Sequence, residues 1–256
     1  MKQYTLCETV ENTALSGKIF QIAFVWKGEK PQAGQFFLIK PKVSSVFLAR
    51  PISVAWADAE TLTFLIAHKG IGAEELSLLR EGEKAYLTGP LGNSWSSFLN
   101  GLSSAEKIAL VGGGLGIAPL LGFAFLLKDL GRAFDFFAGF QTALPLDWRG
   151  LEPFVVTEYG ATDRKGLVTD FLRPEQYGTV FACGSFPMLK VIAKSCRAQG
   201  TPCVVSMEKR MACGVGACLG CAVETVNGYR RCCSDGPIFR AEEIFYVEQL
   251  NYTKLA

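Results

Sequence analysis

Histidine is nearly absent from this 256-residue sequence, which contains only His68, and no segment carries a block of like charges. The formal net charge is +2, from 26 Lys and Arg residues against 24 Asp and Glu residues. Proteins that bind nucleic acids or anionic membranes usually present a concentrated basic surface, so we expect neither function. With an apolar fraction of 49%, the chain can form a buried core.

The first fifteen residues lack the apolar run of a secretory signal peptide. We therefore expect a cytoplasmic protein, in a reducing compartment where disulfides are rare. Residues 108–127 carry no charge and are long enough for a transmembrane helix, but a glycine cluster and Pro119 interrupt their first half. A buried strand, a glycine turn and a buried helix explain the segment better, so no membrane span is expected.

Hydrophobic patterning divides the chain into three parts. Residues 1–100 contain short apolar runs separated by turn residues, which predicts an antiparallel β-barrel or sandwich with one helix at residues 73–79. Residues 101–207 alternate buried strands with helices, which is typical of an α/β domain with a parallel sheet. Residues 208–256 begin with a cysteine- and glycine-rich loop that shows little regular patterning. We predict a mixed fold of three corresponding domains.

The individual elements follow from the same patterns. Strands are predicted at residues 19–25, 36–39, 52–56, 62–67 and 85–88 in the first part. In the second part, strands are predicted at residues 108–111, 134–140, 154–157, 180–183 and 203–207, with helices at residues 119–130 and 187–199.

Cysteine is the abundant residue: the chain has nine, and five lie between residues 213 and 233. Cys213, Cys218 and Cys221 have the spacing C-x4-C-x2-C, which plant-type [2Fe–2S] sites use together with a distal fourth cysteine. The glycines between them permit tight bends that bring backbone amides close to the sulfur atoms. A zinc site and ordinary reduced thiols are the alternatives, but zinc sites usually pair two short C-x2-C hooks. Spacing alone does not choose between Cys232 and Cys233 as the fourth ligand.

A glycine turn marks a second candidate site. Residues 112–119 follow a predicted strand and open a predicted helix, and read G-x-G-x-x-P from Gly114 to Pro119. Such a turn can present backbone N–H groups to a pyrophosphate at the helix N-terminus. A tight strand–helix turn needs glycines too, but the context favours a nucleotide site. His68 could transfer protons at a cofactor, although a partly exposed residue at a strand end is the simpler interpretation.

Taken together, these motifs resemble the ferredoxin–NADP reductase superfamily and, within it, the electron-transfer subunits of dihydroorotate dehydrogenase, over nearly the whole chain. Residues 50–53 resemble the superfamily's R-x-x-S flavin motif. Residues 69–73 resemble its G-x-G turn at the FAD pyrophosphate, with alanine where the family usually has threonine, and residues 89–92 resemble its G-P-L-G. The resemblance implies that FAD is bound by Arg50, Pro51, Ile52, Ser53, Lys69, Gly70, Gly72 and Ala73.

Further matches concern the nicotinamide and the cluster. The resemblance implies that Gly113, Gly114 and Gly116 form the nicotinamide phosphate loop. Residues 183–188 resemble C-G-P-x-P-M, which implies that Cys183 lies near the nicotinamide; a small buried thiol at a strand end is an equal alternative. Residues 233–237 resemble C-x-D-G-P, which selects Cys233 over Cys232. The implied cluster ligands are Cys213, Cys218, Cys221 and Cys233.

The resemblance implies a subunit of an NAD-dependent dihydroorotate dehydrogenase, an enzyme of pyrimidine biosynthesis. Its partner would be an FMN-containing catalytic subunit that oxidises dihydroorotate to orotate, in a heterotetramer with two of each subunit. Electrons would pass through the [2Fe–2S] cluster and FAD to NAD+, because a flavin can exchange both single electrons and hydrides. No residue of this chain is expected to act as a catalytic acid, base or nucleophile.

Two alternatives remain at this point. One is a related flavin and iron–sulfur subunit of a sulfide dehydrogenase or of an NADH-dependent ferredoxin–NADP reductase. Those relatives have aspartate where this chain has Cys213, which favours the dihydroorotate family. The other is a ferredoxin-like carrier with a docking domain, which would hold the cluster but no FAD.

Overall fold

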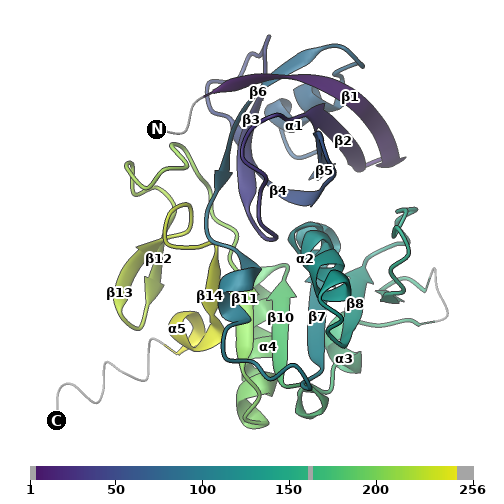
Figure 1. Ribbon diagram of the computed structural model, residues 1–256, viewed down its shortest axis with the longest axis vertical. Helices are drawn as coiled ribbons and strands as arrows, with labels where there is room; N and C mark the ends of the chain where they lie inside the picture. Colours follow the sequence, from purple (N-terminus) through teal and green to yellow (C-terminus); the bar gives the residue numbers. More distant parts are fainter. Residues whose placement is uncertain (1–3, 161–163, 247–256) are drawn as a thin grey trace.

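Alternation of buried and exposed residues builds the first part of the chain into a closed barrel (Figure 1). The structure is a computed structural model and describes residues 4–160 and 164–246. The barrel order is β1-β2-β5-β4-β3-β6, and all neighbouring strands are antiparallel, as predicted. The elements are β1 (Thr5–Ser16), β2 (Ile19–Val25), β3 (Phe36–Pro41), β4 (Arg50–Ala57), β5 (Thr61–Ala67), α1 (Ile71–Ser77), β6 (Lys84–Leu91) and η1 (Trp95–Phe98).

Large aromatic side chains fill the barrel. Phe24, Phe37 and Phe64 are fully buried. Phe37 contacts Trp26 and Phe64 edge-to-face, with ring centroids 4.9 and 6.0 Å away. This geometry adds a favourable electrostatic contribution to the burial of apolar surface. The barrel interior is therefore packed with side chains, and a cofactor has to bind at its rim.

Strand β1 was not predicted from the sequence. Only Cys7 and Thr9 of its twelve residues are fully buried, so the segment shows no apolar run. Its position depends on β2 and β6, to which it pairs on either side. Closure of the barrel thus recruits a polar segment that local patterning does not reveal.

The second part forms one sheet with the strand order β14-β11-β10-β7-β8-β9, which is parallel except for β14. Its elements are β7 (Ile108–Gly113), η2 (Gly114–Ile117), α2 (Ala118–Asp129), β8 (Phe134–Phe140), β9 (Phe154–Thr157), α3 (Val168–Phe171), η3 (Pro174–Gln176), β10 (Thr179–Cys183), α4 (Phe186–Ala198) and β11 (Cys203–Ser206). The predicted parallel sheet is confirmed.

Helices cover both faces of this sheet. Ile108 and Leu110 of β7 pack with α2 on the face turned toward the barrel, and α2 also contacts β4. Ala109 and Val111 face the other way and share a core with residues of α3 and α4. The two faces of one strand therefore belong to two separate hydrophobic cores, as a doubly covered sheet requires.

The cysteine-rich part is more regular than the sequence indicates. It contains β12 (Ala222–Thr225), β13 (Gly228–Arg231), β14 (Ile238–Arg240) and α5 (Ala241–Phe245). β12 and β13 form a hairpin, whereas β14 joins the large sheet antiparallel to β11. These strands are short and largely polar on one side, which explains why no periodic pattern predicts them.

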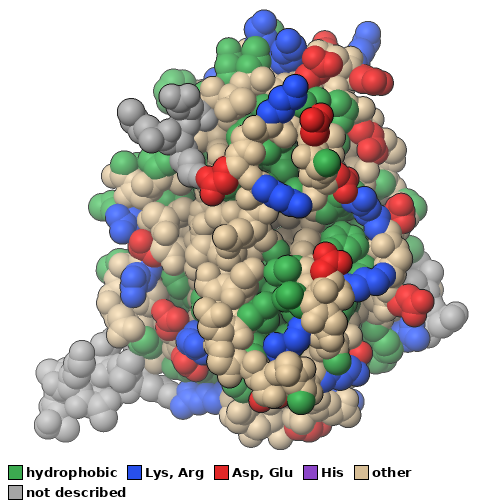
Figure 2. Space-filling view, viewed as in Figure 1, with side chains coloured by type: hydrophobic (Ala, Val, Ile, Leu, Met, Phe, Trp, Pro, Cys, Tyr) green, Lys and Arg blue, Asp and Glu red, His purple; other side chains and the backbone are tan. Residues whose placement is uncertain are grey.

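Charges of both signs are interspersed on the face seen in Figure 2, without a large area of one sign. None of the helices in the described part of the chain has the length and hydropathy needed to span a bilayer.

Asn93 and Trp95 join the barrel to the rest of the molecule. The Asn93 amide nitrogen donates to the carbonyl of Ile238 at 2.8 Å, and its amide oxygen accepts from the Ile238 N–H at 3.0 Å. The buried Trp95 indole donates to the Pro119 carbonyl at 2.8 Å and stacks on Phe123. The segment after β6 is thus bonded both to β14 and to the start of α2.

We expect Asn93→Ala to lower the free energy of unfolding by about 1–3 kcal/mol, because both polar groups of the Ile238 backbone lose their partner. Chemical denaturation measures the change. The control is Asn100→Ala, at an exposed position. Equal stability of the two variants would contradict the linking role of Asn93.

Candidate functional site

Two cysteines of the loop after β11 form the first thiol pair. The Cys218 N–H donates to the Cys213 sulfur at 3.4 Å. Burial raises the pKa of Cys213, but bonds from the N–H groups of Val215, Cys218 and Ala217 outweigh it and lower the pKa to about 6. Converging amides of this kind favour a thiolate. Cys213 is half-buried and Cys218 is exposed, so this pair faces the surface.

Cys221 and Cys233 form the second pair, which is buried. The hairpin β12–β13 brings them together: Ala222 pairs with Arg231, and the Cys233 N–H donates to the Cys221 sulfur at 3.4 Å. The Gly216 N–H donates to the Cys233 sulfur at 3.1 Å. Burial and the neighbouring Cys221 raise the pKa of Cys233 to about 12.

The arrangement favours Cys233 over Cys232 as the fourth ligand. The amide-to-sulfur bonds within the described residues reach Cys213, Cys221 and Cys233. Cys232 is fully buried, and burial raises its pKa to about 12. Cys221 and Cys233 lie in the same apolar cluster, so burial does not separate Cys232 from Cys233; the hydrogen bonds that link Cys233 to Gly216 and Cys221 do.

Four thiols arranged two by two fit a dinuclear iron cluster, in which each iron takes two cysteine sulfurs. The backbone N–H groups aimed at the sulfurs provide the hydrogen bonds that stabilise thiolate ligands. Because metal binding requires thiolates and the raised pKa of Cys233 favours its thiol form, Cys233 would have to release a proton to serve as a ligand. Within residues 4–160 and 164–246, no three Cys, His, Asp or Glu side chains gather as a single metal ion would require.

The flavin motif places a guanidinium beside a glycine turn. Arg50 begins β4, and its Nη2 donates to the Leu48 carbonyl at 2.6 Å. Its Nε is buried and has no hydrogen-bond partner within the described residues. A Cβ on Gly72 would lie 3.1 Å from that Nε, so a glycine at this position allows the first turn of α1 to pack closely on the Arg50 side chain. Gly70 has φ 81° and open space on its Cβ side.

A buried N–H without an acceptor fits an anionic ligand such as a pyrophosphate, because unsatisfied buried donors are rare in folded proteins. The other predicted flavin residues lie around this point with different exposure. Pro51, Ile52 and Ser53 continue β4 and are half-buried. Lys69 is exposed, whereas Ala73 is a buried residue of α1. His68 is exposed at the end of β5, with its ring 5.0 Å from that of Phe20.

The glycine loop and Cys183 meet at the point where the order of the strands in the sheet reverses. The chain runs outward from β7 through β8 to β9, then returns to β10 on the other side of β7. In sheets of this type, ligands bind at the carboxyl ends of the two strands flanking that switch. Gly112 is paired with Cys183 at those ends. Burial raises the pKa of Cys183 to about 12, although a hydrogen bond with Ser206 opposes the rise.

The three loop glycines have different roles. A Cβ on Gly116 would lie 2.2 Å from the Cys183 carbonyl oxygen, and one on Gly113 would lie 2.4 Å from the Met188 sulfur. Gly113 thus allows the end of β7 to pack against α4, and Gly116 allows η2 to pack against the end of β10. Gly114 has φ 56° and open space beside it, so it is the loop residue with room for a ligand.

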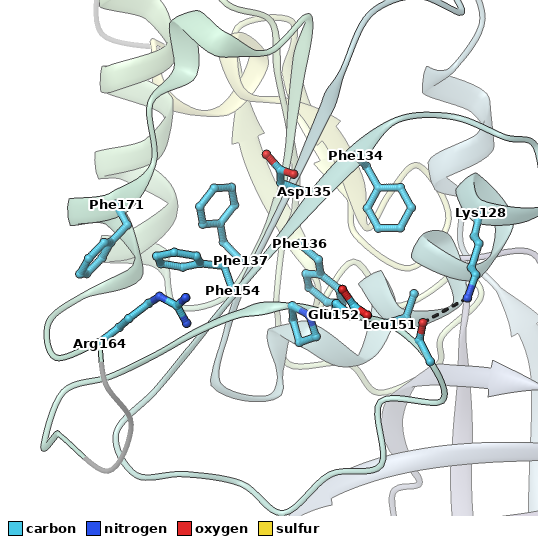
Figure 3. Close-up of a pocket in the computed structure, with 12 residues that line it drawn as sticks. Lys128, Phe134, Asp135, Phe136, Phe137, Leu151, Glu152, Phe154, Arg164 and Phe171 are labelled. Carbon is cyan, nitrogen blue, oxygen red and sulfur yellow. Dashed lines mark hydrogen bonds between the residues drawn. The ribbon is translucent and has the colours of Figure 1, made fainter.

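A hollow also lies away from the predicted cofactor residues. A cavity of about 730 Å³ lies at the amino ends of β8 and β9, lined by Phe134, Asp135, Phe154 and Arg164 among others (Figure 3). The guanidinium of Arg164 lies 4.1 Å from the ring centre of Phe154. Sequence analysis did not indicate this hollow, and it contains no predicted cofactor residue.

Comparison with known proteins identifies the family. Residues 208–245 match the model described as the iron–sulfur cluster binding domain of dihydroorotate dehydrogenase B. The dihydroorotate dehydrogenase B (NAD(+)) electron transfer subunit of Clostridium acetobutylicum is 38% identical over 250 residues, which cover 95% of this chain and 98% of that protein. The chain belongs to this family of electron transfer subunits. The Caldanaerobacter subterraneus family member is also 38% identical, over 93% of this chain and 96% of its own length.

Solved structures show the same architecture. The family fold superimposes with a TM-score of 0.83 on an NADH-dependent reduced ferredoxin–NADP oxidoreductase structure, studied for flavin-based electron bifurcation, at 27% identity over 100% of this chain and 95% of the other. A ferredoxin–NADP+ reductase from Neisseria gonorrhoeae, solved with bound FAD and NADP, has a TM-score of 0.64 over 78% of this chain and 93% of its own, and at 17% identity it shows the fold alone.

Sequence analysis noted Asp235 only as part of the C-x-D-G-P motif and missed its partner Arg231. Arg231 and Asp235 form an ion pair with 3.0 Å between Nε and Oδ2. The Arg231 Nη1 donates to the Gly216 carbonyl at 3.4 Å, and the Gly216 N–H donates to the Cys233 sulfur at 3.1 Å. Arg231 ends β13 and Asp235 follows four residues later, a spacing that is not distinctive in the sequence.

We expect Gly116→Ala to lower the free energy of unfolding by about 1–3 kcal/mol, because the added methyl group overlaps the Cys183 backbone, which cannot rotate away as a side chain can. The comparison is with Gly17→Ala, an exposed position with open space around the added atom. Thermal denaturation of both variants measures the difference. If Gly116→Ala were as stable as Gly17→Ala, the packing role assigned to Gly116 would be incorrect.

Proposed function

We propose that this chain passes electrons from an FMN-containing catalytic subunit, which oxidises dihydroorotate to orotate, through a [2Fe–2S] cluster and FAD to NAD+. The observation that carries the proposal is the set of two thiol pairs held by backbone amides in the iron–sulfur domain. When bound, the cluster would carry single electrons and the flavin would convert them into hydride equivalents.

The packing of the cysteine loop against the barrel supports this route. A Cβ on Gly214 would lie 2.7 Å from Leu38 Cδ1, so the loop backbone touches β3. Leu38, Cys221 and Cys233 belong to one buried apolar cluster, which also contains Ala49, the residue before Arg50. The thiol loop and the strand that carries the flavin motif therefore contribute to the same apolar core.

The residues of this chain would position cofactors and would not perform acid–base chemistry. Arg50 and the turn at Gly70 and Gly72 would hold the FAD pyrophosphate, with Pro51, Ile52, Ser53, Lys69 and Ala73 lining the site. Gly113, Gly114, Gly116 and Cys183 would form the nicotinamide site. Cys213, Cys218, Cys221 and Cys233 would be the cluster ligands.

The family also suggests the assembly and its surroundings. We propose a heterotetramer with two copies of each subunit, in the cytoplasm, and a division of this chain into domains at residues 1–100, 101–207 and 208–256. Reconstitution with a catalytic subunit tests the function. Orotate-dependent oxidation of NADH is the expected activity, and its absence with a subunit that binds this chain would remove the proposal.

A second candidate is a flavin and iron–sulfur subunit of an NADH-dependent ferredoxin–NADP oxidoreductase, favoured by the likeness of the whole chain to such a structure. Two observations favour the dihydroorotate family over it. The relatives with 38% identity are dihydroorotate dehydrogenase subunits, and Cys213 provides a thiolate where we expect aspartate in the alternative. Reduction of ferredoxin or NADP+ without any orotate activity would support the second candidate.

We expect Cys218→Ser to abolish the cluster absorbance while FAD stays bound, because an iron would lose one of its two thiolates and the barrel site is separate. Iron analysis and visible spectra of anaerobically purified protein provide the measurement. Cys232→Ser is the matched control and should retain both cofactors. Cluster loss in Cys232→Ser with retention in Cys218→Ser would reverse the ligand assignment.

We expect Arg50→Ala to weaken FAD binding by roughly ten- to hundredfold, because a bond between a guanidinium and a charged acceptor contributes about 1.5–3 kcal/mol. Flavin stoichiometry after dialysis, followed by titration with FAD, measures the change. Arg80→Ala, at an exposed position of the same barrel, provides the control. Unchanged FAD affinity in Arg50→Ala would place the flavin elsewhere.

A further inference from the structure

We propose that Arg231 and Asp235 form a positioning pair that holds the cysteine loop closed and sets the electron affinity of the cluster, the two residues acting in opposite directions. The inference rests on the proposed function, because it concerns the potential of the cluster assigned to the four thiols. Neither residue is a ligand or a catalytic residue: each acts through the sulfur atoms and backbone next to it.

Arg231 binds Asp235 by three hydrogen bonds. Its backbone N–H and its Nε donate to Oδ2 at 2.8 and 3.0 Å, and its Nη2 donates to Oδ1 at 3.0 Å. Two parallel bonds between a guanidinium and a carboxylate fix both groups in one geometry. The Asp235 side chain is 18% exposed and that of Arg231 is 42% exposed, so the pair lies at the edge of the protein interior.

The same arginine reaches across to the other half of the loop. Its Nη1 donates to the Gly216 carbonyl at 3.4 Å. Gly216 is the residue whose N–H donates to the Cys233 sulfur at 3.1 Å. The guanidinium therefore bridges the segment that carries Cys213 and Cys218 to the segment that carries Cys233, and it restrains a peptide that contacts a ligand sulfur.

The backbone of Arg231 adds a second restraint. Its carbonyl accepts hydrogen bonds from the N–H groups of Ser234, Asp235 and Gly236 at 3.2, 2.8 and 3.2 Å. The turn that contains Cys233 is therefore folded onto the residue that also binds Gly216. Loss of the guanidinium would free one side of this closed loop while the backbone turn remains.

Charge gives the pair its second effect. Reduction would add one electron to the cluster iron, and a nearby positive charge favours added negative charge. The Arg231 guanidinium contacts the Gly216 peptide, whose N–H donates to the Cys233 sulfur, so its positive charge lies one peptide away from that sulfur. The Asp235 carboxylate, which is bonded to that guanidinium, carries the opposite charge and opposes its effect. Removal of the arginine charge should therefore lower the midpoint potential, and removal of the carboxylate charge should raise it.

The test is a redox titration of the purified, cluster-loaded chain, followed by electron paramagnetic resonance of the reduced state. We expect Arg231→Gln to shift the midpoint potential to a more negative value and Asp235→Asn to shift it to a more positive value. Arg231→Lys keeps the positive charge but cannot make the two parallel bonds to Asp235. It should therefore shift the potential less than Arg231→Gln does, but release iron to a chelator faster than the wild-type chain.

Arg230→Gln is the matched control, because Arg230 is exposed on the same strand and adjacent strand residues point to opposite faces. A shift in Arg230→Gln as large as that in Arg231→Gln would overturn the proposal in favour of general surface charge. Shifts of Arg231→Gln and Asp235→Asn in the same direction, or no shift, would overturn it too. If Arg231→Gln cannot be isolated with its cluster, the sign of the shift in Asp235→Asn decides alone.

Failure of the proposed function would look different. A wild-type chain without iron or a paramagnetic signal would remove the cluster itself, whereas a normal wild-type signal with unshifted variants would remove only the role of Arg231 and Asp235.

Discussion

Backbone amides that point at cysteine sulfurs are the constraint on which the rest of this molecule depends. Three N–H groups converge on Cys213, and the peptides of Gly216 and Cys233 bond to the second thiol pair. A loop can hold this geometry only if it is tightly curled and externally supported. The barrel supports it through Leu38, and the hairpin β12–β13 supports it from the other side.

This constraint explains why three differently built parts share one core. Leu38 of the barrel, Val205 of the sheet and Cys233 of the loop belong to the same buried cluster. Asn93 bonds the end of the barrel to β14, next to the turn that carries Cys233. The segments that carry Arg50, the switch point of the sheet and the four thiols are thereby packed into one unit.

The sequence predicted features that depend on neighbouring residues and left open those that depend on contacts between distant parts of the chain. The apolar runs of β2 and β7 and the spacing of Cys213, Cys218 and Cys221 are readable because each is a short-range pattern. β1 was missed because its outward face is polar and closure of the barrel decides its conformation. The packing role of Gly116 was undecidable because its contact, Cys183, lies far along the chain. The strands after residue 221 are too short to show a period.

The path of the last strand has a consequence for modularity. Because β14 lies antiparallel beside β11, the polypeptide leaves the large sheet, forms the thiol loop and then returns to the edge of the same sheet. The thiol loop is therefore anchored at both ends to the large sheet, by β11 before it and by β14 after it. A genetic excision of this segment would not yield a miniature ferredoxin, and grafting it onto a foreign reductase would require transplanting the sheet edge with it.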